Sequence, residues 1–246
     1  GLAANTNYDV EISEPDVSPL QLQGPKSKEI MIEIFGGQIT ELKYYWFKQF
    51  KFNSTDLIIS RTGWSSELGY EIFLTDSKVG NDLYDHIMTI GEPMGLKPGH
   101  TSTIRRIEAG MLSYHADMTI NTNPLELGMD KFIDLTDDFD FIGKNALFKI
   151  KNEGIKRKQV GLYLDNSRMK GPNTRFWDLM YDNKIVGKIT SAVYSPRLEQ
   201  NIALAIVDID YSNINQKLII NDGDSEFNAV VVNKPFYDTT KNITKS

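Results

Sequence analysis

The sequence predicts an α+β fold in two parts, a mixed part over residues 1–153 and a small all-β part over residues 154–246. Three observations predict it. Alternating, strand-like runs are interleaved with runs of helical periodicity through Gly91. The charged stretch Lys149–Lys158 then favours a linker between domains. Beyond it, short strand-like runs are separated by turn residues, which is typical of a small β domain.

The elements of the first part follow from the spacing of apolar residues. Tyr8–Ile12 and Leu20–Gln23 alternate between apolar and polar residues, which predicts strands. Apolar residues at helical spacing predict a helix over Lys26–Phe35, preceded by Gly24-Pro25 and closed by Gly36-Gly37. Further expected elements are an aromatic strand over Tyr44–Phe52 packed under a helix, a partner strand over Asp56–Ser60, a strand from Gly69 to Leu74 and a helix over Asp76–Gly91.

The expected strands of the second part are short and evenly distributed. They are Val160–Leu164, Lys184–Thr190, Ile202–Val207, Lys217–Ile220 and Ala229–Val232.

Composition narrows the class of protein. A net charge of -6 and a pI near 5.2 argue against nucleic acid as the main partner, because phosphate binding needs a basic surface. There is no cysteine, which excludes disulfides and thiol catalysis. The sequence has no apolar run long enough to span a membrane and no signal-like start, so we expect a cytoplasmic protein without a membrane partner. His86, His100 and His115 lack metal-ligand spacing, so we expect no metal site.

The stretch Arg61–Leu74 is the most informative in the chain. Period-two alternation after Gly69 sends Tyr70, Ile72 and Leu74 to one face of a strand and Glu71 with Phe73 to the other. A carboxylate beside an aromatic ring, with Trp64 in the preceding turn, suits a flat heterocycle that carries N–H donors. The alternative is a surface glutamate on a half-exposed strand.

Three ordered stretches resemble the glycine-cleavage aminomethyltransferase (GcvT) family. The run from Arg61 to Ile72 resembles its folate-site signature. Arg106–Gly110 with Asn123–Gly128 resembles its RLEAG…PLE-x-G segment, and Ser191–Pro196 with Asn201–Ala205 resembles its carboxy-terminal domain. The resemblance implies a GcvT-type folate-binding domain followed by a barrel-like β domain, with tetrahydrofolate as the methyl acceptor.

The resemblance also implies roles for single residues. Glu71 matches the glutamate that grips the pterin edge, with Trp64 stacking beside it, and Arg106 matches an arginine implicated in folate binding through the acidic tail. Tyr114 sits at a recurrent family tyrosine expected to line the pocket, and Phe73 is expected to contact substrate. For Arg106, an ordinary ion pair with Glu108 or a neighbour is the alternative. No catalytic acid, base or nucleophile is assigned.

Within the family, the Trp64 turn and residues 10–27 resemble dimethylsulfoniopropionate demethylases. That implies transfer of a methyl group from a small sulfonium substrate to tetrahydrofolate, which gives methylmercaptopropionate and 5-methyltetrahydrofolate. Phe73 departs from the tyrosine expected there, which puts substrate choice in doubt. The alternatives are the aminomethyltransferase of the glycine cleavage system and a folate-binding protein without transfer activity.

The chain begins with Gly1 and, compared with the family, enters midway through the folate-binding part. The resemblance therefore implies that an amino-terminal portion of the site is missing and that the chain alone is inactive. Its oligomeric state stays open, with a homodimer as one alternative.

Overall fold

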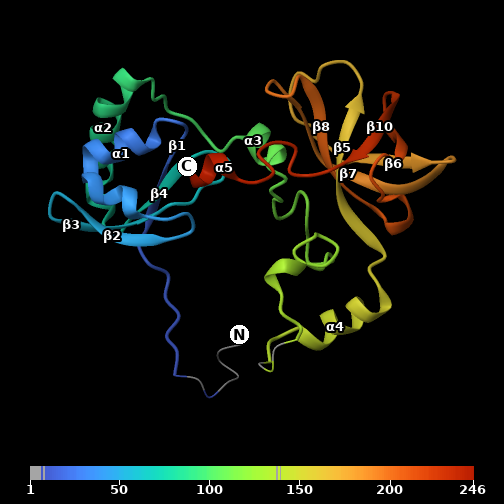
Figure 1. Cartoon of the computed structure of the whole chain (residues 1–246), viewed down its shortest axis with the longest axis horizontal. Helices are drawn as coiled ribbons and strands as arrows, with labels where there is room; N and C mark the ends of the chain where they lie inside the picture. The colour runs from blue at the N-terminus through green and yellow to red at the C-terminus, as the bar shows by residue number, and fades with distance from the viewer. Residues whose placement is uncertain (1–6, 8, 137, 139) are drawn as a thin grey trace. The chain divides into compact units, whose positions relative to one another are not determined.

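The computed structural model describes residues 7, 9–136, 138 and 140–246. The chain divides into two compact units (Figure 1). Unit 1 comprises residues 1–63, 67–100 and 242–246, and unit 2 comprises residues 64–66 and 101–241. The predicted domain boundary after residue 153 falls inside unit 2, and as a statement about domains it stays a prediction.

Unit 1 is a four-stranded antiparallel sheet with helices on one face. The strand order is β1-β4-β3-β2. Its elements are β1 (Ser18–Gln23), α1 (Ser27–Phe35), η2 (Gly37–Glu41), β2 (Phe47–Phe52), β3 (Thr55–Ser60), β4 (Gly69–Leu74), η3 (Ser77–Val79), α2 (Gly80–Gly91), η4 (Glu92–Met94) and α5 (Asn242–Lys245).

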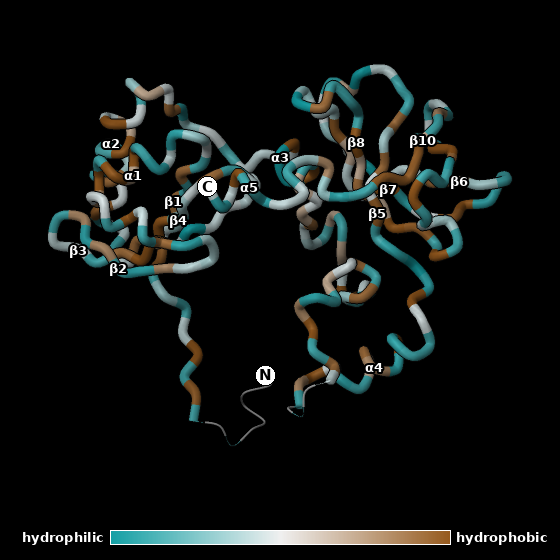
Figure 2. The backbone as a smooth tube through the Cα atoms, in the orientation of Figure 1, coloured by the Kyte–Doolittle hydropathy of each residue, from teal (hydrophilic) through white to brown (hydrophobic). Residues whose placement is uncertain are grey.

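The core of unit 1 lies between the sheet and its two longer helices. Tyr70, Ile72 and Leu74 of β4 are buried there, as the alternation predicted, together with Met31 of α1 and Leu83 of α2. Apolar segments of these helices and strands run side by side in Figure 2. The opposite face of the sheet carries Glu71 and Phe73, so the predicted division of β4 into an inner and an outer face is confirmed.

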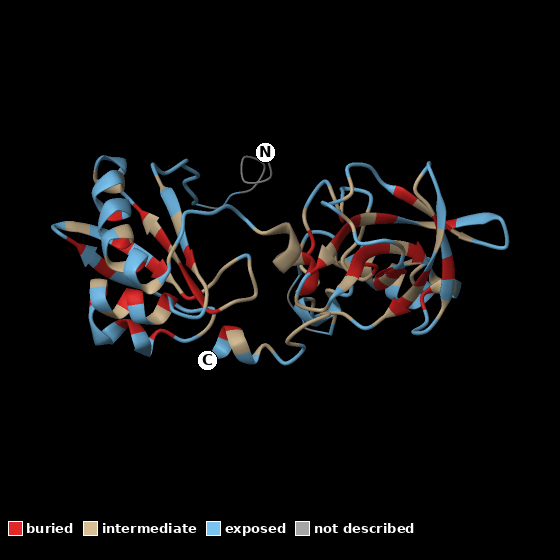
Figure 3. Cartoon of the chain, turned by 90° about the horizontal axis from the view of Figure 1, so that it is seen from above, coloured by how far each residue is buried: buried red, intermediate tan, exposed pale blue. Residues whose placement is uncertain are grey.

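Unit 2 is built on a closed six-stranded barrel with the order β10-β5-β8-β7-β6-β9. Its strands are β5 (Arg157–Asp165), β6 (Trp177–Tyr181), β7 (Lys184–Ser195), β8 (Gln200–Asp208), β9 (Lys217–Asn221) and β10 (Glu226–Val232). Its helices are α3 (Thr103–Glu108), η5 (Asp130–Phe132), α4 (Lys144–Glu153) and η6 (Ile209–Tyr211). Residues of the barrel core recur at every second position, as Val160, Leu162 and Leu164 do in β5, so side chains fill the interior as in other small barrels. Figure 3 shows buried residues, in red, on the strands of the barrel.

Most expected elements are present, with three differences. The expected strand at Tyr8–Ile12 begins on Tyr8, which lies outside the described residues, and residues 9–12 form no strand. Val10 and Ile12 are exposed there, and an alternating run without a neighbouring strand leaves its backbone groups unpaired. The stretch Lys149–Lys158, expected to link domains, is mostly regular structure, because α4 continues to Glu153 and β5 begins at Arg157, and its role between domains stays a prediction.

The third difference is β6, which was not predicted. Trp177 and Leu179 are buried in alternation with Asp178 and Met180, a signal that was present in the sequence but short. The strand is needed to close the barrel, because it pairs with both β7 and β9.

Among the described residues, no helix combines the length and the apolar character that crossing a membrane requires.

Candidate functional site

The centre of the candidate site in unit 1 is the carboxylate of Glu71, on the outer face of β4. Sheet register places Gln21 of β1 opposite Glu71 on one side and Ser60 of β3 on the other, with Phe47 of β2 beyond Ser60. Directly paired residues share a face, so these side chains form one row across the sheet. The row is polar except at Phe47, which is 70% exposed.

Two neutral side chains hold the Glu71 carboxylate. The Gln21 amide donates a hydrogen bond to Oε1 over 2.8 Å, and the Thr62 hydroxyl donates to Oε2. Thr62 in turn contacts the hydroxyl of Ser60. Within the described part of the chain no lysine or arginine forms an ion pair with Glu71. The carboxylate is therefore fixed in place while keeping its negative charge uncompensated.

The glycines of the signature make room for a second glutamine of β1. A Cβ at Gly63 would lie 2.1 Å from the Gln23 side chain, and one at Gly69 would lie 2.4 Å from it. The Gln23 amide uses this space to donate to the carbonyls of Thr62 and Tyr70, over 3.2 and 3.3 Å. Gln23 thus ties together the two ends of the turn that precedes Glu71.

Arg61, the first residue of the signature, has a structural role in unit 1. Its side chain is buried, and its guanidinium donates to the carbonyls of Leu42 and Thr244, each over 3.3 Å. It also donates to the carbonyl of Ser246. Arg61 therefore anchors the short helix α5 against the end of β3, next to Thr62.

Phe73 lies one row along the outer face from Glu71. Its cross-strand neighbours are Pro19 and Ile58, and Ile58 is 39% exposed. The outer face of this sheet thus presents an acceptor beside an apolar patch, which is the combination a planar ring with N–H donors requires.

Unit 2 contains a second carboxylate cluster, centred on Asp117. Its Oδ2 accepts from the Arg106 guanidinium over 2.8 Å and from the backbone N–H of Ser113 over 2.9 Å. Its Oδ1 accepts from the hydroxyls of Thr190, over 2.6 Å, and Ser191, over 2.7 Å. The Asp117 side chain is fully buried, so this cluster joins the loop after α3 to the barrel strand β7.

The hydroxyls of Thr190 and Ser191 both reach the Asp117 carboxylate because β7 is irregular between Ile189 and Ser191. Adjacent residues of a regular strand point to opposite faces. The pairing of β7 with β8 shifts register between Ile189 and Ser191, and a bulge of this kind re-aims a side chain. The irregularity therefore turns both hydroxyls toward Asp117.

Arg106 pairs with Asp117, not with Glu108. The buried Glu108 carboxylate is instead held by Arg105, over 2.8 Å, and by the hydroxyl of Ser195, over 2.6 Å. Arg106 thus forms an ion pair, as the alternative expected, but its partner is a residue eleven positions further along the chain and not Glu108. The Arg106 side chain is 12% exposed.

Trp64 and Tyr114 both belong to unit 2. Trp64 is 36% exposed, and Tyr114 is 55% exposed. The Tyr114 ring lies 4.4 Å from the ring of His115, and its backbone follows Ser113, which donates to Asp117. Asp117 therefore connects the Arg106 side chain to the segment that carries Tyr114, whereas Glu71 and Phe73 lie together in unit 1.

One lysine in unit 2 has a strongly perturbed acidity. Burial lowers the pKa of Lys234 to about 8, and nearby Lys158 lowers it further while the Asp117 carboxylate opposes the shift. The ammonium contacts the side-chain oxygen of buried Gln159. Lys234 thus lies within electrostatic reach of the Asp117 cluster.

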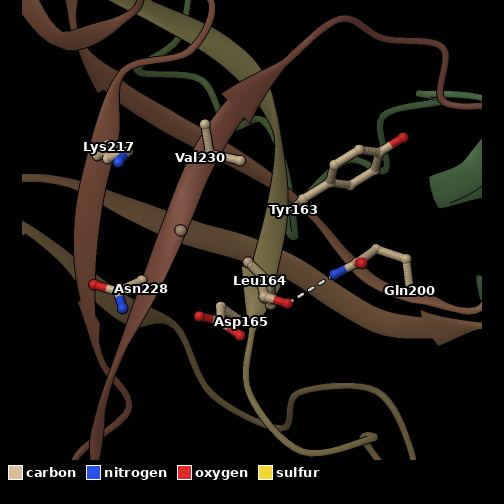
Figure 4. Close-up of a pocket in the computed structure, with 8 residues that line it drawn as sticks. Tyr163, Leu164, Asp165, Gln200, Lys217, Asn228 and Val230 are labelled. Atoms are coloured by element: carbon tan, nitrogen blue, oxygen red, sulfur yellow. Dashed lines mark hydrogen bonds between the residues drawn. The ribbon is translucent and has the colours of Figure 1, made fainter.

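A pocket of about 530 Å³ lies on the barrel wall of unit 2 (Figure 4). Tyr163, Asp165 and Gln200 line it from β5 and β8, and Lys217 and Asn228 line it from β9 and β10. The Gln200 amide donates to the carbonyl of Leu164 over 2.8 Å. These side chains are exposed or half-buried and combine one acid, one base and two amides with the Tyr163 ring.

Gln21, Thr62 and Asp117 were not assigned functional roles from the sequence. Gln21 falls in the predicted strand Leu20–Gln23, but its position opposite Glu71 depends on the pairing of β1 with β4, which are not consecutive in the chain. Asp117 lies in a segment without periodicity, and such a segment carries no pattern that predicts a buried side chain.

Family models match both parts of the chain. The GCVT N-terminal domain matches residues 2–137, and the glycine cleavage T-protein C-terminal barrel domain matches residues 157–238.

Individual proteins are similar over most of the chain. The dimethylsulfoniopropionate demethylase DmdA of Ruegeria pomeroyi is 35% identical over 208 residues, 85% of this chain and 56% of its own length. An aminomethyltransferase of Thermoanaerobacter pseudethanolicus is also 35% identical, over 94% of this chain and 62% of its own length. The chain therefore spans between 56% and 62% of these two relatives, which match it equally well.

A solved structure shows the same fold. The glycine cleavage system aminomethyltransferase T of Bartonella henselae aligns with a TM-score of 0.79 at 20% identity, covering 90% of this chain and 60% of that protein.

Proposed function

The chain belongs to the glycine cleavage T-protein family, and from this premise we propose that it forms part of a tetrahydrofolate-dependent one-carbon transferase. More specifically, we propose demethylation of dimethylsulfoniopropionate to methylmercaptopropionate, with 5-methyltetrahydrofolate as the second product. The observation that carries the proposal is the Glu71 carboxylate, a fixed anionic acceptor on the outer face of β4 beside Phe73.

The residues on this face fit a pterin ring. A carboxylate offers about four lone-pair positions, and those used by Gln21 and Thr62 leave one on each oxygen for ring N–H groups. Phe73 and Ile58 supply the apolar contact that the ring face needs. Tetrahydrofolate, when bound, supplies the amine nitrogen that accepts the methyl group, and the sulfonium sulfur keeps the bonding electron pair as a neutral thioether.

The contribution of the chain in this proposal is orientation. Glu71 is proposed to fix the ring edge, and Phe73 on the same face to hold the cationic sulfonium by about 0.5–2 kcal/mol. Tyr114 of unit 2 stays a separate proposed substrate contact. Alignment of this kind supplies on the order of 7–11 kcal/mol of a reaction barrier. The methylated amine nitrogen then releases its proton to water, so the transfer is written without a side-chain acid or base.

Arg106 and Trp64 remain proposed folate contacts. A guanidinium has about five N–H donors, and bonds to Met111, Asp117 and Ser191 use both donors on Nη1 and one on Nη2. The Arg106 Nε–H and the second Nη2–H are proposed to bind the acidic tail. Trp64 is proposed to stack on a flat ring through its exposed indole.

Calorimetric titration with tetrahydrofolate tests the role of Glu71. Glu71→Gln replaces an anionic acceptor by an amide whose N–H₂ faces ring donors, so we expect affinity to fall by about 10- to 100-fold. Glu41→Gln is the matched control, because Glu41 of the same unit is exposed and forms only a 3.7 Å ion pair with Lys48. Equal affinities for all three proteins would contradict the assignment of Glu71.

The choice of substrate is tested by assay. The protein with tetrahydrofolate and dimethylsulfoniopropionate is expected to form 5-methyltetrahydrofolate. Activity on an aminomethyl-lipoyl carrier protein instead would favour the glycine cleavage reaction, whereas folate binding without either turnover would indicate a binding protein. Phe73→Tyr adds the hydroxyl expected in the demethylases, and we expect it to lower the KM for the sulfonium.

A further inference from the structure

We propose that Gln21 and Thr62 are positioning residues for Glu71, and that Ser60 orients Thr62. The hydrogen bonds among these four side chains hold the Glu71 carboxylate in the orientation that binds the folate ring. This inference rests on the proposed function and assigns roles to residues outside the strand that carries Glu71. The four side chains come from β1, β3, β4 and the segment directly after β3.

The direction of the hydrogen bonds follows from counting protons. Thr62 has one hydroxyl proton, which it donates to Oε2 of Glu71. The contact between the hydroxyls of Ser60 and Thr62 therefore requires Ser60 to donate. Thr62 is thereby prevented from rotating its proton toward Ser60, and its donor stays on the carboxylate.

Gln21 fixes the other oxygen of the carboxylate from the opposite side. Its amide donates to Oε1 over 2.8 Å, across the antiparallel pair of β1 and β4. A carboxylate held at one oxygen from β1 and at the other from the segment after β3 cannot rotate about its terminal bond, which is otherwise a soft torsion. Preorganised acceptors bind a ligand more tightly because less conformational freedom is lost on binding.

Gln23 supports the same unit through the backbone. It donates to the carbonyl of Thr62, which lies one residue after the Arg61 anchor. The hydroxyl of Thr62 is thus placed by contacts on its own main chain as well as by Ser60. Both glutamines of β1 therefore act on the position of the Glu71 carboxylate, one directly and one through Thr62.

The experiment measures tetrahydrofolate affinity of the full chain by calorimetry for three variants. Thr62→Val is nearly isosteric and removes the donor, whereas Thr62→Ser keeps it. Gln21→Met keeps the length of the side chain without its amide. We expect Thr62→Val and Gln21→Met each to weaken affinity about tenfold, and Thr62→Ser to change it less than about twofold.

A double-mutant cycle separates positioning from general stability. If Thr62 acts through the Glu71 carboxylate, adding Thr62→Val to Glu71→Gln weakens binding less than about twofold further. The proposal would be overturned if the fold losses of affinity caused by Thr62→Val and by Glu71→Gln multiplied in the double variant. Unchanged affinity in both Thr62→Val and Gln21→Met would also overturn it. If Thr62→Val fails to fold, the same cycle with Gln21→Met decides.

The two proposals fail differently. Tight binding by the unaltered chain, weakened by Glu71→Gln but not by Gln21→Met or Thr62→Val, would overturn the positioning roles and leave the proposed function standing. Lack of tetrahydrofolate binding by the unaltered chain would overturn both.

Discussion

The two carboxylate clusters of this chain, around Asp117 and around Glu71, are built from similar side chains. They differ in burial and in the number of hydrogen bonds that each carboxylate accepts. Asp117 in unit 2 is fully buried and accepts from a guanidinium, a backbone N–H and two hydroxyls, which fills both acceptor positions on each oxygen. Glu71 in unit 1 is partly exposed and accepts only from an amide and a hydroxyl, one on each oxygen.

The difference separates a structural carboxylate from a binding carboxylate. A buried charge must be paired and fully hydrogen-bonded, so Asp117 has nothing left to offer a ligand. Glu71 is oriented by neutral donors, which hold it without neutralising it. The number of acceptor positions left open distinguishes these roles better than the residue type does.

The largest expected effect is that of Asp117→Asn. The amide can keep its oxygen toward the Arg106 guanidinium and the Ser113 N–H and turn its N–H₂ toward the two hydroxyls, but it removes the negative charge, which leaves the nearly buried guanidinium without a counter-charge. We expect the free energy of unfolding to fall by about 3–5 kcal/mol, measured by urea denaturation. Glu71→Gln on the exposed face is expected to cost less than about 1 kcal/mol. Equal losses in the two variants would mean that both carboxylates are structural.

A second prediction concerns Lys234 beside the Asp117 cluster. Burial lowers its pKa from 10.5 to about 8 in the folded chain, so between these values the unfolded state binds more protons. The free energy of unfolding is therefore expected to rise with pH across this window, on the order of 2 kcal/mol from this group. Lys234→Met should remove that part of the rise in denaturation curves taken from pH 7.5 to 10.5. Parallel pH profiles for the two proteins would contradict it.

Glu126 offers an intermediate case between the two clusters. Its side chain is nearly buried, and Arg157 donates to both of its oxygens over 3.2 Å while remaining 41% exposed. We expect Arg157→Met to lower the free energy of unfolding by about 1–2 kcal/mol, because the backbone N–H of Asn123 still reaches the carboxylate and water can replace the guanidinium. A decrease in the free energy of unfolding as large as that of Asp117→Asn would show that the partial exposure of Arg157 does not reduce the destabilisation.

The smallest expected effect is that of Gly63→Ala. The added methyl group would displace the Gln23 amide, whose bonds to Thr62 and Tyr70 would be lost. We expect about 1 kcal/mol of destabilisation by urea denaturation. Gly37→Ala is the control, because a Cβ at Gly37 meets no atom within 4 Å. Equal stability of the two variants would argue against this role of Gln23.

The sequence predicted what depends on local periodicity. Glu71 was placed on the outer face of β4 because Tyr70, Ile72 and Leu74 had to be inside, and burial confirms it. The helix at Ser27–Phe35 and five of the barrel strands were found in the same way.

What the sequence did not show depends on contacts between distant segments. Gln21 meets Glu71 fifty positions further along the chain, and Thr190 meets Asp117 across seventy-three. The shift in β7 that aims Thr190 at Asp117 is a local departure from alternation, so a rule based on alternation cannot find it.

The pairing of β4 between β1 and β3 limits how the chain can change by insertion or deletion. Removing one residue from within Gly69–Leu74 would turn the distal part of the strand over, exchanging its solvent side and its packed side. A deletion within the strand would disturb both the Glu71 carboxylate and the buried packing on the other face of the sheet. We therefore expect insertions and deletions among homologous chains to occur in the bend before Gly69 and not within the strand.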